Sequence, residues 1–164
     1  SDRRIQRVDG GAERSGSVLN ALLHLHALGA DDEDWVLVHD AARPNLSRDD
    51  LDKLLGDLAD DPVGGLLAVP ARDTLKRVDK EGRVLETVDR SVIWQAYTPQ
   101  MFRLGALHRA LADSLVADAV ITDEASAMEW AGMAPRLIEG RADNLKVTRP
   151  EDLEWLRQRW ANRG

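Results

Sequence analysis

An acidic residue directly follows an apolar run in the first half of the chain. The run Trp35-Val36-Leu37-Val38 continues through His39 to Asp40, and the chain then reads Ala41-Ala42-Arg43-Pro44. In an open α/β sheet, ligands bind beyond the carboxyl ends of the strands. Asp40 is therefore placed to meet a ribose hydroxyl, or a metal ion held by phosphates. The alternative is that Asp40 only begins a turn and pairs with Arg43 at the surface.

Hydroxyl and cationic side chains recur in the segments that follow the other predicted strands. Cations suit phosphate groups, and hydroxyls suit sugar-like groups. The set therefore indicates an anionic, polyhydroxylated ligand: Thr74, Arg90, Thr98, Thr122 and Lys146. For Thr122, which has acidic residues directly behind it, the alternative is a purely structural role as the N-cap of a helix.

A glycine-rich turn containing Gly11 precedes the first predicted helix, and Ser17 stands near the start of that helix. Backbone N–H groups at a junction between a loop and a helix are suited to holding an anion or the edge of a base. Gly-Gly turns are common, so this turn by itself does not specify a ligand.

The residue types also narrow the reaction. The chain has no cysteine, and no nucleophile is paired with a histidine. His24 and His26 are two residues apart, so on a helix they cannot share a metal ion. Covalent catalysis and zinc-dependent hydrolysis are disfavoured. Chemistry that needs mainly positioning and charge stabilisation, such as nucleotidyl or phosphoryl transfer, is favoured.

Composition and charge place the chain among ordinary globular proteins. Of its 164 residues, 43% are hydrophobic and 31% are charged. The net charge of -7 argues against a nucleic-acid partner, although a locally basic pocket can still take a phosphorylated substrate. We find no signal peptide and no apolar run near the ~18 residues of a membrane span, so we expect no membrane partner and a cytoplasmic location.

Strands and helices are predicted to alternate, which indicates an α/β fold with a mainly parallel sheet flanked by helices. Residues 35–39, 64–70 and 135–140 read as strands, and residues 5–8 as a short first strand. Helices are expected from about residue 18, over 48–58 with Ser47 as N-cap, over 105–115, after Thr122, and from Pro150 onward. We expect a single domain over residues 1–164.

An arm is predicted at approximately residues 72–97. Residues 73–78 and 84–88 have partly alternating polarity and flank a charged turn, which is typical of a β-hairpin. A projecting two-stranded ribbon is only marginally stable alone. We therefore expect the arm to pack against another surface, and a second subunit is the obvious candidate.

Six ordered motifs of the chain resemble the 2-C-methyl-D-erythritol 4-phosphate cytidylyltransferases of the non-mevalonate isoprenoid pathway. The resemblance covers essentially all 164 residues. The motifs are Asp9-Gly10-Gly11 with Glu13-Arg14 and Ser17-Val18; Val38-His39-Asp40-Ala41-Ala42-Arg43-Pro44; Asp73-Thr74-Leu75-Lys76; Thr98-Pro99-Gln100; Ile121-Thr122-Asp123-Glu124-Ala125; and Gly140-Arg141 with Asn144-Leu145-Lys146-Val147-Thr148.

The resemblance implies a Rossmann-like nucleotidyltransferase that joins CTP to methylerythritol phosphate and releases pyrophosphate with the assistance of Mg²⁺. It also implies a homodimer in which the two arms interlock. The resemblance assigns Gly11, Ser17, Asp40 and Ala41 to the cytidine nucleotide, and Thr74, Arg90, Thr98, Thr122 and Lys146 to the polyol phosphate. Arg90 and Lys146 would be the catalytic residues that position the phosphate, Thr74 would reach over from the partner, and Asp40 would contact a mainly phosphate-held Mg²⁺.

The chain departs from the family pattern at its N-terminus. The family begins with a strand and a glycine-rich loop whose Arg and Lys cradle the CTP phosphates, and this chain begins about 60 to 70 residues later, by the usual domain length. We expect the 164-residue chain alone to be inactive or nearly so. The alternatives are a cytidylyltransferase for another polyol phosphate, such as ribitol 5-phosphate, and a non-catalytic dimerising fragment. Binding of Mg-CTP separates an enzyme from a bare scaffold.

Overall fold

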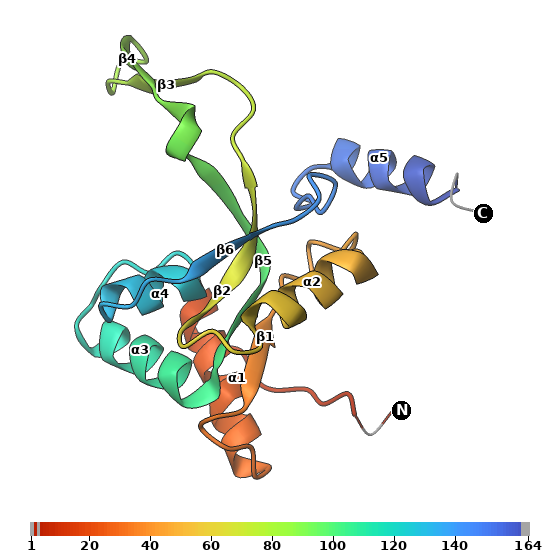
Figure 1. The fold of residues 1–164 in the computed structure, drawn as a ribbon, viewed down its shortest axis with the longest axis vertical. Helices are drawn as coiled ribbons and strands as arrows, with labels where there is room; N and C mark the ends of the chain where they lie inside the picture. The colour runs from red at the N-terminus through yellow and green to blue at the C-terminus, as the bar shows by residue number, and fades with distance from the viewer. Residues whose placement is uncertain (1, 3, 162–164) are drawn as a thin grey trace. The chain divides into compact units, whose positions relative to one another are not determined.

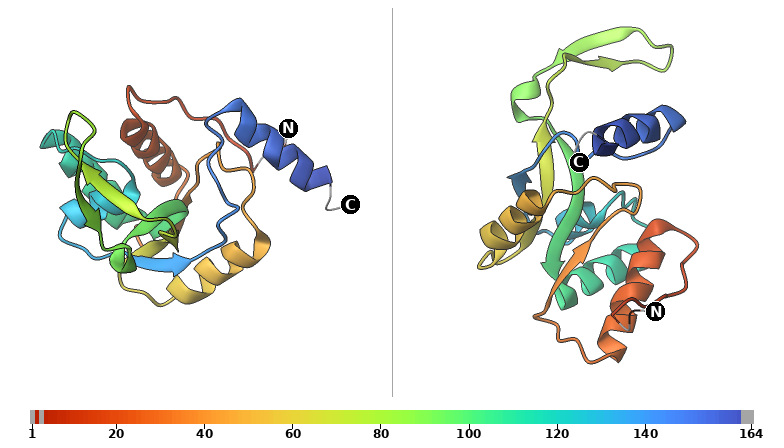
Figure 2. Two further views of the ribbon diagram at one scale, coloured as in Figure 1. Left: turned by 90° about the horizontal axis from the view of Figure 1, so that it is seen from above. Right: turned by 90° about the vertical axis from the view of Figure 1, so that its right-hand side faces the viewer.

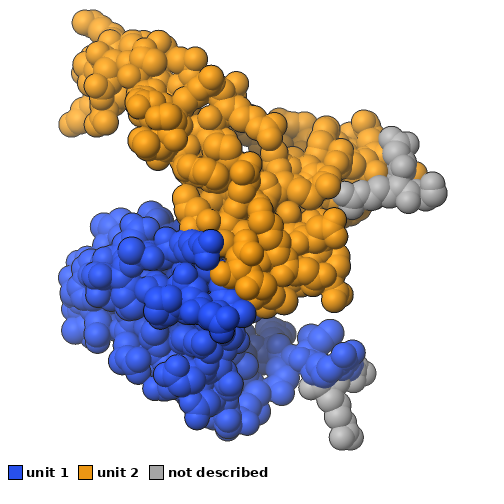
Figure 3. Space-filling view, in the orientation of Figure 1, with its two compact units in different colours: residues 1–38, 58–65, 100–136 blue, residues 39–57, 66–99, 137–164 orange. Residues whose placement is uncertain are grey.

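The computed structural model describes residue 2 and residues 4–161. The chain divides into two compact units (Figure 3). Unit 1 comprises residues 1–38, 58–65 and 100–136, and unit 2 comprises residues 39–57, 66–99 and 137–164.

Four strands form the main sheet: β1 (Trp35–Val38), β2 (Gly64–Pro70), β5 (Trp94–Arg103) and β6 (Arg136–Glu139) (Figure 1). Their order is β1-β5-β2-β6. The bounds of β2 are those predicted from its apolar run, and six of its seven residues are buried. Together with the helices, this mixed sheet confirms the α/β class.

The burial of β1 differs from the expectation of a strand covered on both faces. Only Val36 is buried, whereas Leu37 is 37% exposed. Within the described residues β1 stands at one end of the strand order, and its partner β5 is antiparallel, with Trp35 opposite Arg103. An apolar run of this kind predicts a strand, but its neighbours decide how much of it is covered.

In its described residues, unit 1 contains the helices α1 (Arg14–Ala27), α3 (Leu104–Val116) and α4 (Glu124–Trp130). α3 packs against both α1 and α4 (Figure 1). Leu107 and Leu111, four residues apart on one face of α3, are almost completely buried. This packing forms the core of unit 1.

Two local predictions in unit 1 are wrong. The N-cap of α4 is Asp123 and not Thr122. The Asp123 carboxylate accepts a hydrogen bond from the N–H of Ser126, whose hydroxyl in turn accepts from the N–H of Asp123. Residues 5–8 form no strand; of the residues before them, Ser1 and Arg3 lie outside the described part of the chain.

Unit 2 contains α2 (Arg48–Leu58) and α5 (Pro150–Ala161). The predicted cap of α2 is confirmed, since the Ser47 hydroxyl accepts a hydrogen bond from the N–H of Asp50 at 3.1 Å. Pro150 is the first residue of α5, as its fixed φ favours. No helix in the described ranges is both long enough and apolar enough to cross a membrane.

The predicted hairpin is confirmed as a separate two-stranded sheet. β3 (Leu75–Val78) pairs antiparallel with β4 (Val84–Val88), and the short 3-10 helix η1 (Arg90–Val92) follows. Within unit 2 the hairpin extends away from α2 (Figures 1 and 2). Its strands expose Val84 and Leu85 by 60% and 62%, so the hairpin carries an uncovered apolar surface.

Candidate functional site

Unit 2 brings together three of the predicted site residues. Asp40 lies in a turn closed by a 2.9 Å hydrogen bond from the N–H of Arg43 to the carbonyl of Asp40. The ammonium of Lys146 is 3.1 Å from the Asp40 carboxylate. The backbone N–H of Asp40 donates to the hydroxyl of Thr98 at 3.0 Å. A carboxylate, a hydroxyl and a cation from three separate segments therefore form one cluster.

Arg43 lies inside this cluster and not at the surface. It is 8% exposed, its Nε is 3.8 Å from an Asp40 carboxylate oxygen, and its guanidinium lies over the ring of Tyr97. Burial lowers the pKa of Arg43, an effect that the charge of Asp40 opposes. The alternative reading of Asp40 as a turn residue near Arg43 is thus correct in part, but the pair is partly buried and also adjoins Lys146.

His39 completes the cluster, although the sequence analysis assigned it no role. Its Nε2 lies 2.9 Å from the carbonyl of Arg43, and its Nδ1 lies 2.9 Å from the hydroxyl of Thr98. A carbonyl oxygen only accepts, so these partners assign the proton to Nε2 and leave Nδ1 to accept from Thr98. Since the Thr98 hydroxyl accepts from Asp40, one directed chain of hydrogen bonds fixes the Asp40 backbone.

The hydroxyl of Thr98 is already hydrogen-bonded within the protein. Its side chain is buried, with 4% exposure, and its hydroxyl contacts His39 and Asp40 as described. A direct contact between Thr98 and substrate stays a prediction. Ala41 is exposed in the turn beside Asp40.

Thr74 and Arg90 are the two predicted site residues that lie in the arm. Thr74 precedes β3 and is exposed. Arg90 begins η1 and donates from Nη1 to the carbonyl of Arg72. The Asp40 cluster is held together by bonds among Asp40, Thr98, His39, Arg43 and Lys146, whereas the bond of Arg90 ends on Arg72.

Unit 1 holds the other predicted residues. The N–H of Gly11 donates to the hydroxyl of Ser17 at 2.9 Å, and this hydroxyl donates to the carbonyl of Glu13 at 3.1 Å. A Cβ at Gly11 would lie 2.7 Å from the backbone carbon of Gly16, so only glycine fits this close approach. Gly11 and Ser17, which the resemblance assigns to the nucleotide, are therefore joined in one hydrogen-bonded local structure.

Thr122 is exposed, and its N–H donates to the hydroxyl of Ser126 at 3.0 Å. It lines a narrow pocket together with Arg14 and Glu124. Glu124 is completely buried, and Arg14 binds it with two hydrogen bonds of 2.5 and 3.0 Å. This ion pair could not be predicted from the sequence, because no local pattern relates the start of α1 to the start of α4.

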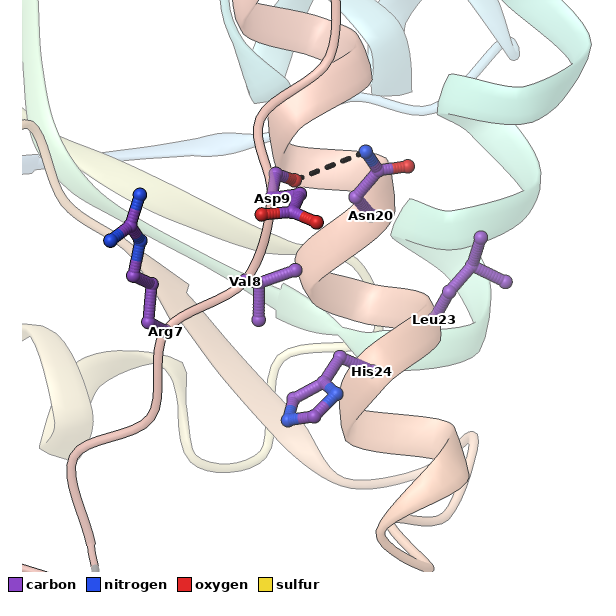
Figure 4. Close-up of a pocket in the computed structure, with 6 residues that line it drawn as sticks. All are labelled: Arg7, Val8, Asp9, Asn20, Leu23 and His24. Carbon is purple, nitrogen blue, oxygen red and sulfur yellow. Dashed lines mark hydrogen bonds between the residues drawn. The ribbon is translucent and has the colours of Figure 1, made fainter.

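A second pocket of unit 1 lies along α1 (Figure 4). It is bordered by the segment that leads to Gly11, and the side chain of Asn20 donates to the carbonyl of Asp9 across it at 3.2 Å. Its lining residues are Arg7, Val8, Asp9, Asn20, Leu23 and His24. None of them is a predicted site residue.

The possible metal ligands are few. Among the described residues, no group of three or more His, Asp or Glu side chains is arranged to hold a metal ion. Mg²⁺ in phosphate chemistry needs only one or two carboxylates together with phosphate oxygens. Asp40, with its side chain 15% exposed, fits a Mg²⁺ ion that substrate phosphates hold for the most part.

Comparison with known proteins gives one consistent answer. The family model described as IspD, 2-C-methyl-D-erythritol 4-phosphate cytidylyltransferase, matches residues 1–157. The chain belongs to this family. A 2-C-methyl-D-erythritol 4-phosphate cytidylyltransferase of Pseudomonas fluorescens (strain Pf0-1) is 93% identical over 163 residues, which cover 99% of this chain and 69% of that protein.

Solved structures of the cytidylyltransferase family agree. The enzyme of Francisella tularensis superposes with a TM-score of 0.80 at 41% identity, covering 92% of this chain and 69% of that one. The enzyme of Thermus thermophilus gives a TM-score of 0.75 at 30% identity, covering 90% and 68%. The nucleotidyltransferase fold and the family predicted from the six motifs are therefore confirmed.

Proposed function

We propose that the protein transfers CMP from CTP to 2-C-methyl-D-erythritol 4-phosphate, releasing pyrophosphate and forming 4-diphosphocytidyl-2-C-methyl-D-erythritol. Membership of the cytidylyltransferase family supports the reaction. The observation that carries it in this chain is the position of Lys146. Its side chain is 46% exposed while its ammonium is held 3.1 Å from Asp40, so a fixed cation is open to a phosphate group.

The proposed chemistry is an in-line displacement. A phosphate oxygen of the polyol phosphate forms a bond to the α-phosphorus of CTP, the bond from this phosphorus to the bridging oxygen breaks, and pyrophosphate leaves. Little covalent chemistry is required of the protein, so catalysis comes from orientation and charge. Lys146 and Arg90 hold the attacking phosphate and balance its charge.

The remaining residues divide between the two substrates. Gly11, Ser17, Asp40 and Ala41 are proposed to contact the cytidine nucleotide, and Thr74, Thr98 and Thr122 the polyol phosphate. When bound, Mg²⁺ neutralises charge on the nucleotide phosphates, and Asp40 is the side chain proposed to contact it.

The arm is proposed to form a homodimer. Val78, Val84, Leu85 and Val92 expose between 49% and 75% of their surface, which is costly for a hairpin left in water. In such a dimer Thr74, and with it Arg90, acts across the interface.

The acidic charge of the chain disfavours a nucleic-acid partner. Action in the cytoplasm without a membrane partner also stays a proposal.

Binding and turnover test this function. Calorimetry with Mg-CTP and with 2-C-methyl-D-erythritol 4-phosphate is expected to show saturable binding of both, and ribitol 5-phosphate is expected to bind more weakly. Pyrophosphate release tests the reaction in a protein that spans the full length of the relatives. The same assay on the 164-residue chain tests the prediction that this chain by itself is inactive or nearly so. If neither substrate binds, the proposed activity is wrong and the alternative of a non-catalytic dimerising fragment is favoured. If ribitol 5-phosphate binds more tightly, the protein is instead a cytidylyltransferase for that polyol phosphate.

A further inference from the structure

The segment that carries Lys146 contains a buried amide with no role in the proposed chemistry. Asn144 is 1% exposed, although it lies in a loop between β6 and α5. Its Nδ2 donates to the backbone carbonyl of Thr98 at 2.9 Å. The side chain of Asn144 thus ties the loop of Lys146 to the strand residue whose hydroxyl holds Asp40.

The backbone around Asn144 is fixed from the Asp40 side as well. Arg43 donates from Nη1 to the carbonyl of Asn144 at 2.8 Å. The N–H of Val147 donates to the carbonyl of Ala42 at 2.7 Å. Lys146 therefore lies between two points at which the segment is bonded to the Asp40 turn and to Thr98.

The ion pair with Asp40 is too weak to fix the side chain of Lys146 by itself. That side chain is half exposed, and an exposed ion pair contributes too little to fix two side chains in one geometry. Buried hydrogen bonds to backbone carbonyls are directional, and a donor removed from such a bond leaves its partner unsatisfied. The position of the Lys146 ammonium therefore depends on the bonds made at Asn144.

We propose that Asn144 is a positioning residue that holds Lys146 beside Asp40 for the substrate phosphate. The proposal rests on the proposed function for the identity of that phosphate. Asn144 is buried, so it acts through the backbone of its segment and touches no substrate.

Amide hydrogen exchange tests the positioning without any ligand. Asn144→Ala is expected to speed exchange of the Val147 and Asp40 amides at least about tenfold, while amides of the unit 1 core in α3 keep their rates. Asn20→Ala is the matched control, because it removes an asparagine bond to a backbone carbonyl in unit 1 and is expected to leave Val147 unchanged. Asn144→Leu nearly retains the volume and removes the donor without burying a charge, so it is expected to act as Asn144→Ala does.

Calorimetry with 2-C-methyl-D-erythritol 4-phosphate tests whether Asn144 affects binding by positioning Lys146. Asn144→Ala is expected to weaken binding at least about tenfold in the native background and less than about threefold in a Lys146→Gln background. Equal losses in both backgrounds would overturn the proposal. So would unchanged Val147 exchange, or a uniform acceleration of all amides in both Asn144 variants. If the native chain does not bind this ligand, the proposed function fails, whereas the exchange experiment still decides the positioning.

Discussion

The ammonium of Lys146 lies 3.1 Å from the carboxylate of Asp40, although the two residues belong to loops far apart in the sequence. The Lys146 side chain is 46% exposed and that of Asp40 is 15% exposed. Such a pair contributes about 0 to 1 kcal/mol to folding. Its contribution to stability is therefore small, and we expect its role to be the presentation of a cation at a defined point.

Replacement of Lys146 tests this division between stability and binding. Lys146→Gln is expected to weaken binding of the polyol phosphate by about 10-fold to 100-fold, because a charge-assisted hydrogen bond is worth about 1.5 to 3 kcal/mol. The free energy of unfolding is expected to change by less than about 1 kcal/mol. Lys53→Gln is the control, since Lys53 donates to the carbonyl of Glu139, outside the Asp40 cluster. Equal affinities of the two variants would contradict the assignment.

Thr98 is expected to stabilise the protein through its hydroxyl. Thr98→Val leaves the N–H of Asp40 without its acceptor, which costs about 1 to 3 kcal/mol in a buried setting. Thr98→Ser keeps the hydroxyl and loses one methyl group, at a cost of about 1 kcal/mol. Urea unfolding measures both. A Thr98→Val variant as stable as the native chain would show that the bonds to Asp40 and His39 contribute nothing.

The buried ion pair of unit 1 should behave differently from surface pairs. Arg14→Met leaves the carboxylate of Glu124 buried without its guanidinium, and breaking a buried pair costs about 3 to 5 kcal/mol. The partial exposure of Arg14, 39%, places the expected loss at the low end. Arg48→Met removes the exposed pair with Asp52 and should cost about 0 to 1 kcal/mol. Similar unfolding midpoints for the two variants would refute the distinction.

Two glycines are expected to respond in opposite ways to the same substitution. A Cβ at Gly65 would lie 1.9 Å from the carbonyl oxygen of Arg136, so Gly65→Ala should destabilise the protein by about 3 kcal/mol or more. Gly56 lies within α2 and a Cβ there meets nothing within 4 Å. Gly56→Ala should therefore add about 0.5 to 1 kcal/mol, because alanine is the better helix former. Thermal unfolding checks both signs.

Asp143 makes the stability depend on pH at the acid side. A hydrogen bond from the guanidinium of Arg141, aided by Arg159, lowers the pKa of Asp143 below its ordinary 3.8. A carboxyl whose pKa is lower in the folded state stabilises the fold above its unfolded pKa, and this contribution is lost as the pH falls through the folded pKa. Native chain and Asp143→Asn are expected to differ in stability at about pH 5 and to converge below 3.8. A difference that grows on acidification would contradict this.

Local structure could be predicted wherever its cause is local. The apolar run of β2, the Ser47 cap and Pro150 at the start of α5 depend only on neighbouring residues, and each was found as predicted. The cap of α4 was misplaced by one residue because Thr122 and Asp123 are both good caps. The hydrogen bond from the N–H of Ser126 to the carboxylate of Asp123 selects between them.

The sequence by itself determined the family, because the six motifs occur in order along the chain. It also predicted the kinds of side chain expected at the site. Tertiary structure alone decided that Asp40, Lys146 and Thr98 meet, that His39 bonds Thr98 and the Arg43 carbonyl, and that Asn144 is buried. The physical reason is that hydrogen bonds and burial depend on distances in space between loops, and no periodicity or spacing within one loop encodes its partner in another.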